Sequence, residues 1–101
     1  VYGKVLLVVV DMRKKSINYL KSKKIELTHS KPKLVLIPPY YANGHLSLSS
    51  MCVFHYKWSY KGKYIEAKKQ HSYRWNDPKL NIKWPIKKPI LSKRDKSSKY
   101  L

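Results

Sequence analysis

The fold class is decided by the stretch KVLLVVVDM, which runs from Lys4 to Met12. Valine and leucine fill its interior, and such a run is typical of a strand that is buried on both faces. The apolar part, from Val5 to Val10, is far too short to span a bilayer, which takes about 20 residues in a helix. We therefore expect a well-buried strand near the start of a protein without a membrane span.

Short strands separated by turn signals are predicted on the rest of the chain. Besides the first stretch, the expected strands are Ser22–Thr28, Leu34–Ile37, Met51–Tyr60 and Ser72–Trp75. The pair Asn43-Gly44 is the favoured pair for a tight hairpin turn. Almost no helix is predicted, and the segment 77–101 reads as an irregular tail of a single domain, 1–101. This pattern indicates an all-β sandwich or barrel.

The longest alternating stretch carries a row of aromatic side chains. If Met51–Tyr60 is a strand, one of its faces holds Phe54, Tyr56, Trp58 and Tyr60. Such a row is suited either to a packed core or to the wall of a pocket.

The charge of the chain is strongly positive. It has 101 residues, with 23 Lys+Arg against 5 Asp+Glu and a net charge of +18. Basic side chains interleaved with aromatic ones are a feature of proteins that bind single-stranded nucleic acid, so a basic β-barrel that binds a polyanion is one alternative. The lysines are scattered from Lys4 to Lys99, and arginine, the better reader of bases, occurs only three times. These two facts argue against a nucleic-acid partner.

Motifs for metal binding and for nucleophilic catalysis are absent from the sequence. The histidines, at positions 29, 45, 55 and 71, form no His-x-His or His-x-x-x-His pair, so no metal site is predicted. A single cysteine, Cys52, excludes an internal disulfide and is typical of a reducing compartment such as the cytoplasm.

Five ordered motifs run through nearly the whole chain. They are GKV at 3–5 with VDMRKKS at 10–16, IPPYYANGHL at 37–46, FHYK at 54–57, WNDP at 75–78 with IKWP at 82–85, and LSKRD at 91–95. They resemble the segments GxVxDVxVDxRxxSPT, IPxGFAHGF, (F/L)YK, WNDPxxxIxWP and LSxKD of the dTDP-4-dehydrorhamnose 3,5-epimerase family. The NGHL and FHYK variants are more similar to epimerases that act on GDP-linked 4-keto-heptoses in capsule synthesis.

The resemblance implies a cupin or jelly-roll-type β-barrel and an isomerase. The substrate would be a nucleotide-diphosphate 4-keto-6-deoxy sugar, used in the synthesis of bacterial surface polysaccharides such as capsule or lipopolysaccharide. A ketone at C4 acidifies the hydrogens on C3 and C5, so a base can remove a proton from one face and an acid can return one to the other. The family is regarded as independent of cofactors, and its members are homodimers.

The resemblance also implies roles for particular residues. Tyr56 matches the tyrosine acid of the family, although a core aromatic is the plainer alternative for it. Asp95 matches the aspartate that orients the catalytic histidine; otherwise it is a solvated acid in a lysine-rich tail.

Further matches suggest contacts with the substrate. Asn43 stands where the main family has histidine, and His45 replaces an aromatic residue. Tyr60 or, alternatively, Tyr64 would take the place of a second tyrosine. Lys57 and Trp75 could contact sugar or diphosphate, although a surface lysine and a packing tryptophan are simpler readings.

The chain departs from the family in one major respect. The RGxHxQ-like segment that carries the histidine base does not occur in these residues, and neither do the N-terminal strands that complete the barrel and swap across the dimer. We therefore expect a truncated, C-terminal portion of an epimerase, an incomplete barrel that exposes the run Val5–Val10 and the aromatic row at 54–60, and little activity from this chain alone. A non-catalytic remnant that binds nucleotide sugar or pairs with a full-length relative is another alternative.

Overall fold

The computed structural model describes residues 1–59, 62 and 70–101. The chain divides into two compact units, Val1–Tyr56 and Lys57–Leu101. The first unit holds the sheet, and the second is mostly irregular apart from one short helix.

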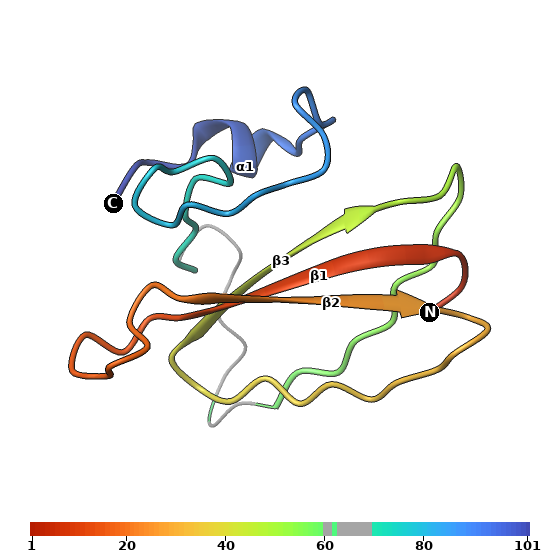
Figure 1. The fold of residues 1–101 in the computed structure, drawn as a ribbon, viewed down its shortest axis with the longest axis horizontal. Helices are drawn as coiled ribbons and strands as arrows, with labels where there is room; N and C mark the ends of the chain where they lie inside the picture. Colours follow the sequence, from red (N-terminus) through yellow and green to blue (C-terminus); the bar gives the residue numbers. More distant parts are fainter. Residues whose placement is uncertain (60–61, 63–69) are drawn as a thin grey trace. The chain divides into compact units, whose positions relative to one another are not determined.

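The first unit is built on a three-stranded antiparallel sheet (Figure 1). Its strands are β1 (Lys4–Asp11), β2 (Ser22–Thr28) and β3 (Tyr41–Ser47), and β1 lies between the other two. Leu7 of β1 is paired with Ile25 on one side and with His45 on the other. The structure thus confirms the all-β class and places the first two predicted strands within one residue of their expected ends.

One face of β1 forms the hydrophobic core of this unit. Val5, Leu7 and Leu27 are buried there. Partly buried side chains pack against them: Val9, Ile25, Val35, Ile37, Cys52 and Phe54. On the opposite face of β1, Val8 and Val10 are 1% and 3% exposed. The expectation that the Val5–Val10 run would be exposed is therefore wrong, because both faces of this strand are withdrawn from water.

The connection from β2 to β3 runs back along the sheet as extended chain (Figure 1). Val35 and Ile37 contact the core, whereas Leu34 and Leu36 are 100% and 89% exposed. The short apolar strand predicted for 34–37 is therefore wrong, because these residues form no strand. A strand needs a partner for its backbone hydrogen bonds, and the prolines at 38 and 39 have no N–H to donate.

The predicted turn at Asn43-Gly44 is wrong, because both residues lie inside β3. They pair with Val9 and Val8 of β1. A type I′ turn needs positive φ at both central residues, and neither of these two has it. The chain instead turns just before β3, where Tyr40 has a φ of 69°.

The two later strands that were predicted are also wrong. The part of Met51–Tyr60 that the structure describes forms a single bridge, from Val53 to Tyr2, and Tyr60 itself lies outside the described residues. Ser72–Trp75 likewise forms one bridge, from Tyr73 to Lys99. Alternating side chains predict which faces a segment presents, but a ladder also requires a second strand in register.

The second unit is held together by a buried carboxylate and a capped helix. Asp77 is 2% exposed, and its carboxylate accepts hydrogen bonds from the backbone N–H groups of Lys79 and Leu101, at 2.8 and 2.6 Å. Helix α1 (Lys93–Ser97) begins after Ser92, whose Oγ accepts a hydrogen bond from the backbone of Asp95. Within the residues that the structure describes, no helix has the length and apolar character needed to cross a membrane.

Candidate functional site

A row of polar side chains lies on one face of β3. Tyr41, Asn43 and His45 alternate with small or apolar residues, so all three share one face of the strand. The register pairs Asn43 with Val9 and His45 with Leu7 of β1. Asn43 and His45 are both exposed, which makes this row accessible to a ligand.

A stack of rings links this row to the tyrosine that the sequence singles out. The rings of His45 and Phe54 are stacked, with centroids 4.6 Å apart and an interplanar angle of 14°. The ring of Phe54 in turn lies 6.1 Å from that of Tyr56, tilted by 38°. Tyr56 is 71% exposed. The structure therefore links His45 to Tyr56 through Phe54, and Asn43 lies two residues from His45 on the same face of β3.

The other end of the row is held by an ion pair at the end of β1. Asp11 is 3% exposed, and its two carboxylate oxygens accept hydrogen bonds from Nε and Nη2 of Arg13, at 3.0 and 2.8 Å. The same Nη2 donates to Oη of Tyr41 at 2.9 Å, and the guanidinium lies 5.2 Å from the centre of the Tyr41 ring. These contacts fix the position of the tyrosine at the start of β3.

The two charges in this cluster stabilise each other. The hydrogen bonds from Arg13 hold the pKa of the Asp11 carboxyl well below its usual range, although burial acts in the opposite direction. Asp11 correspondingly raises the pKa of Arg13. The pair is therefore ionised at neutral pH and forms a rigid support.

The sequence did not identify Arg13 and Tyr41 as site residues. The segment Val10–Arg13 belongs to the first motif, but its role could not be read from the sequence. Tyr41 is 28 residues away in the chain, so only the pairing of β1 with β3 brings the two side chains together.

The remaining predicted residues belong to the second unit or lie outside the described part. Lys57 is exposed. Trp75 is half-buried, and its carbonyl oxygen accepts a hydrogen bond from Nε1 of Trp84 at 2.8 Å. Asp95 is half-buried on α1, and its carboxylate makes no hydrogen bond or ion pair within the described residues. Tyr60 and Tyr64 lie outside the described residues.

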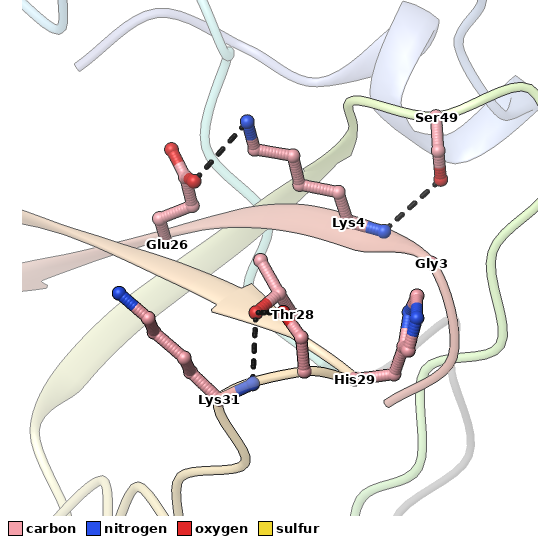
Figure 2. A pocket seen from close by; sticks show the side chains of 8 residues that line it. Gly3, Lys4, Glu26, Thr28, His29, Lys31 and Ser49 are labelled. Carbon is pink, nitrogen blue, oxygen red and sulfur yellow. Dashed lines mark hydrogen bonds and ion pairs between the residues drawn. The ribbon is translucent and has the colours of Figure 1, made fainter.

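An open pocket of about 460 Å³ lies at the other end of β1 and β2 (Figure 2). Nζ of Lys4 pairs with Glu26 at 3.2 Å, and the backbone N–H of Lys31 donates to Oγ1 of Thr28 at 3.2 Å. His29 also lines the pocket and stacks on the ring of Tyr2. None of the residues predicted to act on or bind the substrate lines this pocket, and several of its polar groups already bind one another.

Metal ligands do not gather in the described residues, where no group of three or more His, Cys, Asp or Glu side chains could hold an ion. Asn43, His45 and Tyr56 offer hydrogen-bond donors and acceptors beside aromatic rings. Such a set is suited to binding a polar organic ligand and to transferring a proton.

Comparison with known proteins points to one family. The family model described as dTDP-4-dehydrorhamnose 3,5-epimerase matches residues 1–101. A dTDP-4-dehydrorhamnose 3,5-epimerase of Shigella flexneri is 32% identical over 95 residues, which is 94% of this chain and 51% of that protein. One from Methanothermobacter thermautotrophicus is 30% identical over 102 residues, which is 98% of this chain and 54% of that protein. The chain spans about half the length of the curated relatives it matches.

A solved structure has the same fold. The crystal structure of dTDP-4-dehydrorhamnose 3,5-epimerase from Bacillus anthracis, with TDP and PPi bound, matches with a TM-score of 0.79 and 26% identity. The match covers 99% of this chain and 55% of that one. The expected cupin-type fold is therefore confirmed.

Proposed function

This chain belongs to the dTDP-4-dehydrorhamnose 3,5-epimerase family, and from that premise we propose that it serves in the epimerisation of a nucleotide-diphosphate 4-keto sugar. The single observation that carries the proposal is the family match over residues 1–101. The grouping of Asn43, His45 and Tyr56 within one unit supports it.

The proposed reaction inverts a carbon next to the ketone. The C4 carbonyl stabilises the enolate that forms when a base removes the proton from C3 or C5. An acid then protonates that carbon from the opposite face, which inverts the centre. The acid must reach the sugar, so its hydroxyl has to be accessible.

We assign the role of this acid to Tyr56. Its exposed ring is held beside Phe54, which leaves the hydroxyl free to approach a ligand that lies along β3. Asn43 and His45 would donate or accept hydrogen bonds to the sugar oxygens from the same row.

The residues of the second unit complete the proposal. Asp95 would orient the histidine base of the family, and its carboxylate is free within the described residues to do so. Lys57, Tyr60 and Trp75 would contact sugar or diphosphate.

We further propose that the protein works as a homodimer in the cytoplasm, in the synthesis of a surface polysaccharide. The free thiol of Cys52 is consistent with that compartment.

Ligand binding is the first test. A dTDP-linked deoxy sugar should raise the thermal unfolding midpoint of the chain more than the free sugar does, because only the former carries the diphosphate. Equal responses to the two would contradict the proposed substrate class.

Exchange of hydrogen with solvent is the second test. The family's base motif does not occur in these residues, so we expect slow deuterium incorporation at C3 or C5 of a dTDP-4-keto sugar. Tyr56→Phe should abolish inversion of the carbon, because the acid delivers the proton to the opposite face, whereas Tyr40→Phe, at another exposed tyrosine, should leave inversion unchanged. Exchange and epimerisation that both survive Tyr56→Phe untouched would overturn the acid role. Exchange at enzymatic rates would mean that a base is present, and His45→Ala and His55→Ala would then identify it.

A second candidate function follows from the charge. A protein with a net charge of +18 could bind nucleic acid or another polyanion. Tight, steeply salt-dependent binding of a single-stranded oligonucleotide, together with no response to nucleotide sugars, would favour this candidate over the epimerase.

A further inference from the structure

The hydroxyl of Tyr41 is held in place by groups that do not depend on a ligand. Nη2 of Arg13 donates to it at 2.9 Å, and Arg13 is itself locked by two hydrogen bonds to the buried Asp11. Tyr41 is partly buried, and these hydrogen bonds hold its hydroxyl in one position. Groups that are fixed in advance bind a ligand with little loss of conformational entropy.

The donors of this cluster are only partly used. Because Oη of Tyr41 accepts the hydrogen bond from Arg13, its own O–H proton is left to donate. Nη1 of Arg13 has no hydrogen-bond partner within the part of the chain that the structure describes. Tyr41 and Arg13 thus present O–H and N–H donors, which are suited to a ligand group with several acceptor oxygens.

The position of the cluster along β3 indicates which part of a ligand would reach it. Tyr41 and His45 are four residues apart on one strand face, which corresponds to roughly 13 Å. Tyr56 lies at the His45 end, through the stack with Phe54. If the reacting sugar of a ligand lies beside Tyr56, the distance to Tyr41 is longer than one pyranose ring. The group of the ligand that reaches Tyr41 is then the one attached to the sugar, which in a nucleotide sugar is the diphosphate.

We propose that Tyr41 binds the diphosphate of the nucleotide sugar by donating its O–H to a phosphate oxygen, and that Arg13 positions Tyr41 and adds a donor of its own. This inference rests on the proposed function. A hydrogen bond from a neutral hydroxyl to an ionised phosphate is a charge-assisted one, which is shorter and stronger than a neutral pair.

The test compares nucleoside diphosphates with monophosphates on the whole chain. Calorimetry would measure the affinities of dTDP and dTMP, with GDP and GMP in parallel because the base is not identified. Tyr41→Phe removes one hydroxyl and keeps the ring beneath the guanidinium. It should weaken binding of the diphosphate by about tenfold and leave the monophosphate nearly unchanged, so that the preference for diphosphate falls. Tyr40→Phe, at the neighbouring exposed tyrosine, is the matched control and should bind like the unaltered chain.

The outcomes separate this inference from the function on which it rests. If the unaltered chain prefers diphosphates and Tyr41→Phe keeps the full preference, the inference is wrong and the proposed function stands. If Tyr41→Phe weakens both nucleotides equally, the hydroxyl has a general structural role and the inference is again wrong. If the unaltered chain binds neither diphosphate, both are overturned. Unfolding midpoints of the two variants within a degree of each other would show that the comparison concerns binding.

Discussion

At the scale of single residues, the entry into β3 depends on an unusual backbone conformation at Tyr40. Its φ is 69°, in the left-handed region that side chains other than glycine rarely adopt. Its carbonyl oxygen accepts a hydrogen bond from the backbone N–H of Met12 at 3.0 Å, and its side chain is 78% exposed. The conformation is therefore maintained by backbone pairing, at the expense of local strain.

Replacing this residue by glycine should stabilise the protein. Tyr40→Gly relieves a strain of roughly 1–2 kcal/mol. It loses about 0.5–1 kcal/mol through the greater freedom of the unfolded chain. We expect the free energy of unfolding in urea to rise by up to about 1.5 kcal/mol. Ala42→Gly, two residues later inside β3, lacks the strain and should lower it by about 0.5–1 kcal/mol. A loss of stability in Tyr40→Gly of the size seen for Ala42→Gly would contradict this account.

Asp11 should make the stability of the protein sensitive to acid. The pKa of its carboxyl in the folded state is well below 3.8, its ordinary value, because Arg13 donates hydrogen bonds to it. The unfolded chain thus takes up the proton at a higher pH than the folded one. The stabilisation is present in full above about pH 4 and is lost as the pH falls further towards the lower pKa of the folded state.

The thermal unfolding midpoint of Asp11→Asn checks this prediction. The variant should be less stable than the unaltered chain at neutral pH, and the gap should narrow below about pH 4. If the unfolding midpoints of the variant and the unaltered chain differ by the same amount from neutral to acid pH, the pKa of Asp11 is not lower in the folded state than in the unfolded state.

At the scale of elements, the sheet depends on one central strand. β1 provides the hydrogen-bond partner for both β2 and β3 and, among the described residues, carries most of the buried side chains. The connection between β2 and β3 contributes Val35 and Ile37 to the core but turns its leucines to solvent. Apolar residues of β1 should therefore contribute more to the free energy of unfolding than the exposed leucines of the connection.

Two substitutions of the same residue type test this difference. Leu7 is 2% exposed and Leu34 is 100% exposed. Leu7→Ala should lower the free energy of unfolding by about 2–5 kcal/mol, because it leaves a cavity in the core. Leu34→Ala should change it by less than about 0.5 kcal/mol. Similar losses at both positions, measured by urea unfolding, would mean that the connection is packed in solution.

At the scale of the whole molecule, the dominant property is the charge of +18. Repulsion between like charges destabilises a folded chain, and salt reduces it. The ion pairs found among the described residues are few, with Lys4 to Glu26 exposed and Asp11 to Arg13 partly buried. Most of the positive charge is thus uncompensated within the described residues.

Stability should consequently rise with ionic strength. The screening length falls from about 30 Å at 0.01 M salt to about 8 Å at 0.15 M. Over this range we expect the thermal unfolding midpoint to increase by roughly 5 °C, the equivalent of about 1 kcal/mol for a chain of this size. Sodium chloride and potassium fluoride should act alike, which distinguishes screening from binding of one anion. A midpoint that falls as salt is added would show that attractive pairs outweigh the repulsion.

The sequence by itself determined the first two strands and the family. The β-branched run of β1 and the alternation of Ile25 and Leu27 in β2 depend on local composition, and both strands form where predicted. The ordered motifs led to the family that the comparisons confirm. The residues expected to act, Asn43, His45 and Tyr56, were also named from these motifs, and their roles stay a prediction; the structure links His45 to Tyr56 through Phe54.

Only the tertiary structure decided where the pairing of strands overrides the conformational preference of single residues. Asn43-Gly44 prefers a turn, but in β3 its backbone groups pair with β1, and a continuous ladder outweighs the preference of two residues. Met51–Tyr60 alternates like a strand, and yet its described part forms only the bridge at Val53 with the described residues. The contact between Arg13 and Tyr41 joins residues far apart in the chain. Such contacts depend on strand register, which arises when segments pair in space and is not encoded in either segment alone.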